Sequence, residues 1–266
     1  MMLMATPRSY LFVPGNRPDR FAKAAAAGAG AVIFDLEDAV GPEAKDDARS
    51  HVAQWFADGG TGIVRINGAD TPWHGDDIAA LRDLAAEIMV PKAEPAGMAE
   101  IAARLTARPL MALVETVAGL AALRDTVKVP SLTRLAFGNL DFSADARIPE
   151  GSPALDHARF ELVLASRLGD LLPPIDGVTT ALSDPEAIAR DVRHARSMGF
   201  GAKLCIHPAQ VAPVNAGFAP SDDEIDWARR VIAALENANG AAVQLDGKMI
   251  DRPLIDHARL ILGDIA

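Results

Sequence analysis

Short runs of apolar residues alternate along the chain with longer amphipathic stretches rich in alanine, leucine and charged residues. Nearly continuous apolar runs are typical of strands in a parallel sheet that is buried on both faces. The pattern therefore predicts eight strands, at Ser9–Val13, Ala31–Leu36, Gly62–Ile66, Ile88–Pro91, Leu110–Val114, Arg134–Gly138, Gly177–Thr180 and Ala202–Ile206.

The amphipathic stretches between these runs predict helices, several of which begin with a proline in the first turn. We expect them at Pro18–Ala27, Glu43–Ala57, Pro95–Ala103, Ala154–Leu168 and Asp184–Ser197, with a further helix at Ser221–Asn237. Eight strand units in about 210 residues fit a closed (β/α)8 barrel better than an open doubly wound sheet. The sequence also lacks GxGxxG and GxxxxGK[ST], the phosphate-binding motifs of the dinucleotide-binding and P-loop folds. We therefore predict an α/β fold, a TIM barrel over residues 1–220, with a C-terminal helical extension over residues 221–266 of the same domain.

Composition excludes several classes of function. The chain has 36 acidic and 26 basic residues, a formal charge of −10, which argues against a nucleic-acid partner. Its one cysteine, Cys205, excludes an internal disulfide and a cysteine-based metal site, and suits a reducing cytosol. We find no basic leader with an apolar core, and no apolar run near the roughly 18–20 residues that span a bilayer. These features predict a cytoplasmic protein with no membrane partner.

Polar residues follow directly after almost every predicted strand. A barrel places the carboxyl ends of its strands around one rim, where its chemistry takes place. Burying a lone carboxylate costs several kcal/mol unless it is paired or binds a metal, so we expect these positions to be functional. They are Pro14 to Arg17, Asp35, Glu37, Asp38, Arg65, Asn67, Lys92, Glu115, Asp141, Thr179, Thr180 and His207.

Glu115 and Asp141 follow two neighbouring strands at matching positions. Two converging carboxylates without cysteine or paired histidine favour a hard cation, Mg²⁺ or Mn²⁺, over Zn²⁺. The alternative is a pair of salt bridges at the barrel mouth, to Arg65 and Lys92.

The segment FDLEDAV adds further carboxylates next to this expected site. We expect Glu37 and Asp38 to hold metal-bound waters, and a helix cap is the alternative for Asp38. Arg65 is suited to a bidentate grip on a carboxylate, and it also suits a structural partner of Asp35 or Glu37.

Three basic residues, Arg17, Arg20 and Lys23, follow the Gly-Asn turn at intervals of three. Guanidinium groups near a helix start favour phosphate, and a solvated helix face explains the same charges. His207, before a proline at the last strand end, is interpreted as a structural donor more readily than as a catalyst.

Eight segments occur in an order that resembles a known family. They are RSYLFVPGNRPDRFAKA, FDLEDAV, VRING, MVPKAE, ALVET, FGNLD, KLCIHPAQ and DGKMIDRP. Together they resemble the family of the citrate lyase β-subunit and the malyl-CoA and citramalyl-CoA lyases, grouped with the pyruvate-type aldolases. The resemblance runs over essentially the whole chain and implies a β/α barrel.

The resemblance also implies roles for individual residues. It implies that Glu115 and Asp141 bind Mg²⁺ and that Arg65 holds the carboxylate of the acid fragment. It implies that Asp251, in GKMID, enters the active site of a neighbouring subunit, which requires a homo-oligomer, a trimer or a hexamer. The residues it places near the substrate and its coenzyme A or carrier phosphopantetheine are Pro14, Gly15, Arg17, Arg20, Lys23, Lys92 and Glu115.

The function that follows is a carbon–carbon lyase acting on a short hydroxyacyl thioester. Mg²⁺ would chelate the acid fragment, Arg65, Glu37 and Asp38 would assist, and Asp251 would protonate the released thioester enolate. The alternatives are a citrate lyase β-subunit acting on a carrier-bound citryl thioester, a malyl-CoA thioesterase, and a non-catalytic barrel subunit.

Overall fold

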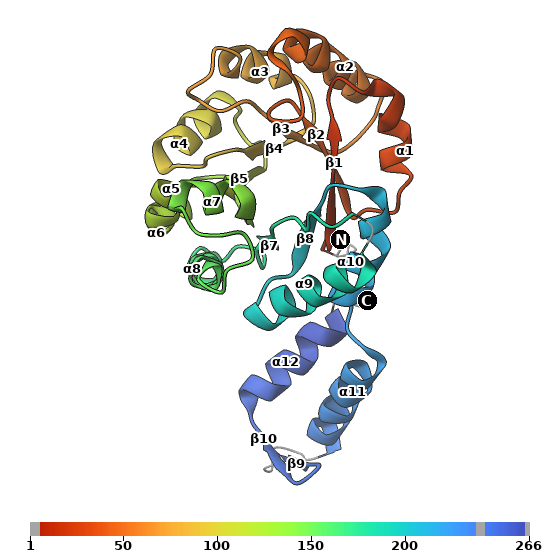
Figure 1. The fold of residues 1–266 in the computed structure, drawn as a ribbon. Coiled ribbons are helices and arrows are strands. Elements are labelled where there is room, and N and C mark those ends of the chain that lie inside the picture. Colours follow the sequence, from red (N-terminus) through yellow and green to blue (C-terminus); the bar gives the residue numbers. More distant parts are fainter. Residues whose placement is uncertain (1–5, 183, 238–242, 264–266) are drawn as a thin grey trace. The chain divides into compact units, whose positions relative to one another are not determined.

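The computed structural model describes residues 6–182, 184–237 and 243–263, and it contains a closed barrel of eight parallel strands (Figure 1). Each strand pairs with its sequence neighbours, and β1 closes the ring by pairing with β8. The predicted TIM barrel is confirmed. The strands are β1 Ser9–Pro14, β2 Ala31–Asp35, β3 Ile63–Arg65, β4 Glu87–Val90, β5 Leu110–Val114, β6 Leu132–Phe137, β7 Ile175–Asp176 and β8 Ala202–Cys205.

Helices connect successive strands and surround the ring in Figure 1. They are α1 Phe21–Ala25, α2 Lys45–Ala57, α3 His74–Leu81, α4 Pro95–Arg104, α5 Val117–Ala121, α6 Leu123–Thr126, α7 Asn139–Ala146, α8 Leu155–Leu168, α9 Pro185–Met198 and α10 Val211–Phe218. Short 3-10 turns lie at Pro18–Arg20, Pro42–Ala44 and Pro208–Gln210. The pattern did not predict α3, α5, α6, α7 or α10, and it made the first helix too long.

Side chains fill the inside of the barrel, so the ring has a packed core and no pore. Every strand contributes at least one residue to this core. The cluster consists of Tyr10, Ile33, Ile63, Met89, Met111, Leu113, Ala136, Ile175, Ala202 and Leu204.

The prediction of the seventh strand at Gly177–Thr180 is wrong, because β7 ends at Asp176. The side-chain amide of Asn139 takes the place of a neighbouring strand beyond that point. Its Oδ1 accepts the Val178 N–H at 2.8 Å, and its Nδ2 donates to the Val178 carbonyl at 3.2 Å. A side chain at Gly177 would overlap the Asn139 amide. Two hydrogen bonds of the Asn139 side chain therefore replace the strand-to-strand hydrogen bonds at this end of the barrel.

Residues from Gly217 onward belong to a second compact unit, distinct from the barrel unit Pro7–Ala216. It contains α11 Asp222–Asn237, the hairpin β9 Val243–Leu245 and β10 Lys248–Ile250, and α12 Arg252–Gly263. Its own apolar cluster includes Ala228, Val231 and Ile261. Within the described ranges, no helix is both long and apolar enough to cross a membrane.

Candidate active site

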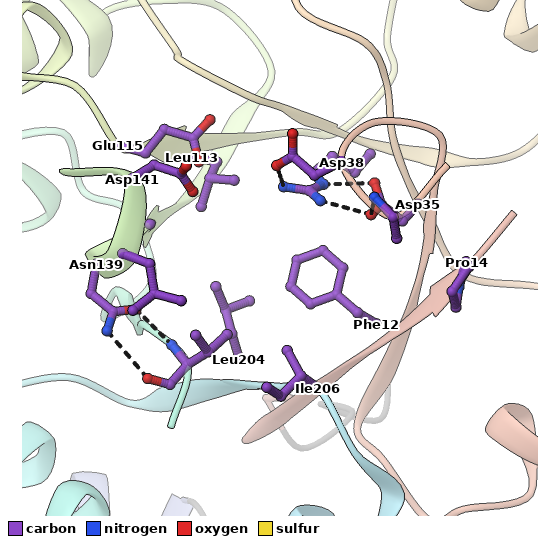
Figure 2. Close-up of a pocket in the computed structure, with 15 residues that line it drawn as sticks. Phe12, Pro14, Asp35, Asp38, Leu113, Glu115, Asn139, Asp141, Leu204 and Ile206 are labelled. Atoms are coloured by element: carbon purple, nitrogen blue, oxygen red, sulfur yellow. Dashed lines mark hydrogen bonds and ion pairs between the residues drawn. The ribbon is translucent and has the colours of Figure 1, made fainter. Parts of the chain in front are cut away.

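A cavity of about 380 Å³ opens at the carboxyl ends of the strands (Figure 2). Carboxylates lie on two sides of it, and its floor is apolar. Its lining consists of Phe12, Pro14, Asp35, Asp38, Ala39, Arg65, Leu113, Glu115, Gly138, Asn139, Leu140, Asp141, Val178, Leu204 and Ile206. Six of the predicted rim positions therefore meet at this cavity: Pro14, Asp35, Asp38, Arg65, Glu115 and Asp141.

Arg65 ends β3 and is shared by three carboxylates. Its Nε and Nη2 donate to the two oxygens of Asp35, each at 2.7 Å, in a bidentate pair. Its Nη1 lies 3.1 Å from Glu37 Oε2 and 3.3 Å from Asp38 Oδ2. Burial lowers the pKa of Arg65, but Asp35 outweighs this and holds it above its usual value, so the guanidinium stays charged. The structural pairing expected as an alternative is present, and Asp38 contacts Arg65 rather than a helix start.

Glu37 and Lys92 extend this network of ion pairs. Glu37 is buried, and burial raises its pKa to about 7 against the opposing charge of Arg65. Lys92 Nζ lies 3.5 Å from Glu37 Oε1. The backbone of Lys92 is left-handed, with φ of 44°, a conformation that costs energy for a residue with a Cβ. In this conformation its N–H donates to Glu115 Oε1 at 2.8 Å.

Glu115 and Asp141 lie side by side at the mouth (Figure 2). Glu115 follows β5 and is 2% exposed, and its Oε2 has no hydrogen-bond partner among the described residues. Burial, with a further contribution from Glu37, raises the pKa of Glu115 to about 8. Asp141 is exposed and lies in the first turn of α7 rather than at a strand end, because the helix begins directly after Gly138.

This pair fits a hard divalent cation. Neither carboxylate forms an ion pair with Arg65, Lys92 or another cation in the described part of the chain, so the alternative of two mouth salt bridges is wrong. The described residues contain no cluster of three or more histidine, cysteine or acidic side chains that would hold a metal by itself. Mg²⁺ commonly binds through one or two carboxylates and keeps several waters. The unpartnered oxygen of Glu115 is therefore the best-suited protein ligand here.

A second cavity, of about 400 Å³, shares Phe12, Pro14 and Ile206 with the first. Its lining adds the basic residues Arg20 and Lys23. It also includes His207, whose Nδ1 accepts the Ala209 N–H at 3.2 Å, so this histidine is a structural acceptor here and not the expected donor.

The predicted Pro-Gly turn lies between these cavities, and Pro14 lines both of them. Gly15 donates its N–H to the Asp35 carbonyl at 2.8 Å, where an added Cβ would lie only 2.9 Å from that oxygen. Arg17 does not line either cavity and is bound to Asp19 by two hydrogen bonds, of 2.9 and 2.7 Å.

The sequence model of the HpcH/HpaI aldolase/citrate lyase family matches residues 8–208. The chain belongs to this family. A citrate lyase subunit beta-like protein of Deinococcus radiodurans is 36% identical over 96% of both chains. A (3S)-malyl-CoA thioesterase of Cereibacter sphaeroides is also 36% identical, over 96% of this chain and 93% of the relative. Among solved structures, Mycobacterium tuberculosis CitE in complex with magnesium, acetoacetate and coenzyme A superposes with a TM-score of 0.86. That match is 33% identical and covers 98% of each chain.

Asp251 of this HpcH/HpaI family member lies in the second unit, between β10 and α12. It is exposed, and its Oδ1 accepts the Leu254 N–H at 3.3 Å near the start of α12. Its expected entry into a neighbouring subunit stays a prediction.

Sequence reasoning missed the residues that support the predicted ones. Asn139 clamps the loop after β7 and lines the cavity. Gly138 leaves the space that the Glu115 side chain occupies. Both lie within FGNLD, where the Gly-Asn pair just before an aspartate was an available signal. Lys45 is buried under the loop after β2 that contains Glu37 and Asp38, here called the acidic loop. It was missed because a lysine in EAKDD is typical of a solvated helix start.

Proposed function

We propose that the protein is a magnesium-dependent lyase that cleaves a short hydroxyacyl-CoA thioester, of the malyl-CoA or citramalyl-CoA type, into a 2-oxo acid and an acyl-CoA, or joins them. The observation that carries this proposal is the pair of Glu115 and Asp141, in which a buried carboxylate oxygen faces a cavity without a partner. The related CitE of Mycobacterium tuberculosis was solved with magnesium, acetoacetate and coenzyme A.

Glu115 and Asp141 would hold the cation, and Mg²⁺ bound there supplies Lewis-acid polarisation of the substrate's carboxylate and adjacent oxygen. The Lys92 N–H fixes one oxygen of Glu115, so that the other is left for the cation. The carboxylates of Glu37 and Asp38 would hold metal-bound water at this rim. Arg65 compensates the negative charge of the acid fragment.

The charge of the cavity favours an acid fragment with one carboxylate. Within the described part of the barrel, Arg65 is the one cationic side chain in the lining, and Asp35, Glu37 and Asp38 already contact it. A second carboxylate, as in a citryl thioester, would lie against an apolar floor, at a cost of several kcal/mol. That floor contains Phe12, Leu113, Val178, Leu204 and Ile206. Hydrogen or methyl at the carbinol carbon fits this floor better.

The second cavity supports a coenzyme A thioester. Arg20 and Lys23 line this cavity, which shares a wall with the first one. Their positive charges suit the phosphates of the coenzyme. Cleavage breaks the bond between the carbinol carbon and the thioester α-carbon, and the electron pair stays on the α-carbon. The hydroxyl proton leaves to water as the keto group forms. We propose that Asp251 of a second copy protonates the α-carbon, in a cytoplasmic homo-oligomer, a trimer or a hexamer.

The experiment is a panel of hydroxyacyl-CoA thioesters incubated with purified protein and Mg²⁺, with keto acid and free thiol measured in parallel. Release of keto acid without free thiol is expected. Asp141→Asn should lose activity about a thousandfold, since the metal contributes several kcal/mol. Asp145→Asn on the same helix, which keeps an oxygen for the Val117 N–H, is the matched control and should retain activity. Unchanged activity of Asp141→Asn in chelator would refute the metal site.

Hydrolysis of the thioester is the second candidate, because the Cereibacter sphaeroides relative is named a (3S)-malyl-CoA thioesterase. The same panel separates the two reactions. A thioesterase releases one equivalent of free coenzyme A thiol and the intact hydroxy acid, and no keto acid. A barrel without catalysis releases neither product from any thioester.

A further inference from the structure

A buried lysine lies directly beneath the acidic loop. Lys45 is the first residue of α2, and it is only 5% exposed. Both properties are unfavourable for a lysine, because a cation at a helix start opposes the helix dipole and burial removes its water. The chain therefore places this ammonium group where specific acceptors compensate it.

All three protons of the Lys45 ammonium group have acceptors. Nζ donates to the carbonyl oxygens of Leu36 and Glu37, each at 2.7 Å, and to Asn67 Oδ1 at 2.6 Å. The first two acceptors belong to consecutive residues of the loop after β2. The third follows β3, so Lys45 joins the rim ends of two neighbouring strands.

The third acceptor is itself held in one orientation. The N–H and Nδ2 of Asn67 both donate to Asp77 Oδ2, at 2.8 and 2.7 Å. The other oxygen of Asp77 accepts from Arg49 Nε at 2.8 Å. With its amide nitrogen committed to Asp77, Asn67 presents its oxygen to Lys45.

The Lys45 contacts hold the two peptide groups on either side of Glu37, through the carbonyls of Leu36 and Glu37. The Glu37 N–H donates to Asp35 Oδ1 at 2.9 Å, and the Glu37 carbonyl also accepts the Val40 N–H at 3.1 Å. With its N–H and its carbonyl both held, Glu37 has one direction for its Cα–Cβ bond, from which its side chain starts. That direction leads to Arg65, at 3.1 Å.

We propose that Lys45 is a positioning residue that holds the Leu36 and Glu37 carbonyls and thereby aims the Glu37 carboxylate at Arg65 and Lys92. It touches neither substrate nor metal and acts through the loop. Its effect on turnover rests on the proposed lyase function, whereas its effect on the loop does not.

The test compares Lys45→Met with Lys128→Met, an exposed lysine on the outside of the barrel, as matched control. Lys45→Met should lower kcat about a hundredfold, the usual cost of misplacing a group by about 1 Å, and change KM less than about threefold. In a double-mutant cycle with Glu37→Gln, the double variant should be no more than about threefold worse than the poorer single variant. Multiplicative losses, or an unchanged kcat in Lys45→Met, would overturn the proposal.

Hydrogen exchange measured by mass spectrometry gives a readout that needs no substrate. Lys45→Met should accelerate amide exchange at residues 36–40 and leave β5 unchanged. Acceleration throughout the barrel to the same degree would assign Lys45 to general stability and overturn the proposal.

Misfolding of Lys45→Met and an inactive wild type each call for a second measurement. If Lys45→Met does not fold, Lys45→Arg takes its place, because a planar guanidinium keeps the charge but cannot converge on three acceptors as an ammonium does. A wild-type kcat in Lys45→Arg would then overturn the proposal. If the wild type releases neither keto acid nor free thiol from any thioester, the proposed function fails, and the exchange experiment alone decides the role of Lys45.

Discussion

Replacing Gly138 with alanine tests the arrangement of the two carboxylates with one methyl group. Gly138 precedes α7 with φ of −85° and ψ of 74°, so alanine meets no left-handed backbone strain there. The added Cβ would lie 2.7 Å from Glu115 Oε2 and closer still to Glu115 Cβ. Ordinary contact begins at 3.4 Å, so the carboxylate oxygen has to move by about 0.7 Å and Glu115 Cβ by more than that.

The backbone offers little room for this movement. The Gly138 N–H donates to the Val114 carbonyl at 3.0 Å, which ties the two strand ends together. Overpacking of this kind costs about 1–3 kcal/mol, and a displacement approaching 1 Å at a reacting centre costs roughly a hundredfold in rate. We expect Gly138→Ala to fold, to bind Mg²⁺ at least about tenfold more weakly, and to lose about a hundredfold in kcat/KM.

Calorimetric titration with Mg²⁺, thermal unfolding and the thioester assay measure these three effects. Gly97→Ala is the matched control. Gly97 lies inside α4, no heavy atom lies within 4 Å of its added Cβ, and alanine is favoured over glycine in a helix by about 0.8–1 kcal/mol. Wild-type metal affinity and turnover in Gly138→Ala would refute the reasoning, because the carboxylate would then tolerate the overlap.

Three further predictions concern charge. Arg20→Gln with Lys23→Gln should raise KM for a coenzyme A thioester about tenfold or more and leave a pantetheine thioester unaffected; an equal effect on both removes the phosphate assignment. Burial raises the pKa of Asp176, but Lys203 outweighs it and the net pKa is lowered, so this carboxylate stabilises the fold above about pH 4 and the contribution is lost on further acidification. Asp176→Asn should cost about 3 kcal/mol in urea unfolding at pH 7 and less at pH 3; an equal cost at both contradicts the ion pair. Burial raises the pKa of Glu115 to about 8, so stability in chelator is lost as pH rises from about 4 toward 8. Glu115→Gln should remove that slope while abolishing turnover, and an unchanged slope counts against the burial.

The barrel could be predicted because its signal is local and repeated. An apolar run such as Leu110–Val114 lies in a strand whose five residues are all buried, so the pattern and the packing agree. The seventh strand failed because its limit depends on Asn139, which is far away in the sequence. Short helices such as α5 and α6 have too few turns to show a period of their own.

Some residues of the candidate site could likewise be predicted from the sequence, and others could not. Carboxylates such as Glu115 were found because a charge directly after a buried strand is unexpected on burial grounds alone. Lys45 was missed because its three acceptors are two backbone carbonyls and an amide oxygen, and carbonyls leave no trace in a sequence. The left-handed backbone of Lys92 was missed for a similar reason, since lysine does not signal that conformation. Side-chain chemistry could be predicted, and the backbone geometry that aims it could not.

The two sides of the mouth differ in how their charges are compensated. Around Arg65, carboxylates and cations contact one another at short distances, so that side is held together without a ligand. Glu115 and Asp141 have no cationic partner in the described part of the chain, although Glu115 is buried. Uncompensated burial destabilises the protein, and a chain retains it where a ligand supplies the missing charge. The asymmetry supports the proposal that the cation binds at Glu115 and Asp141, and that Arg65, already fixed in direction, faces the anionic end of the substrate.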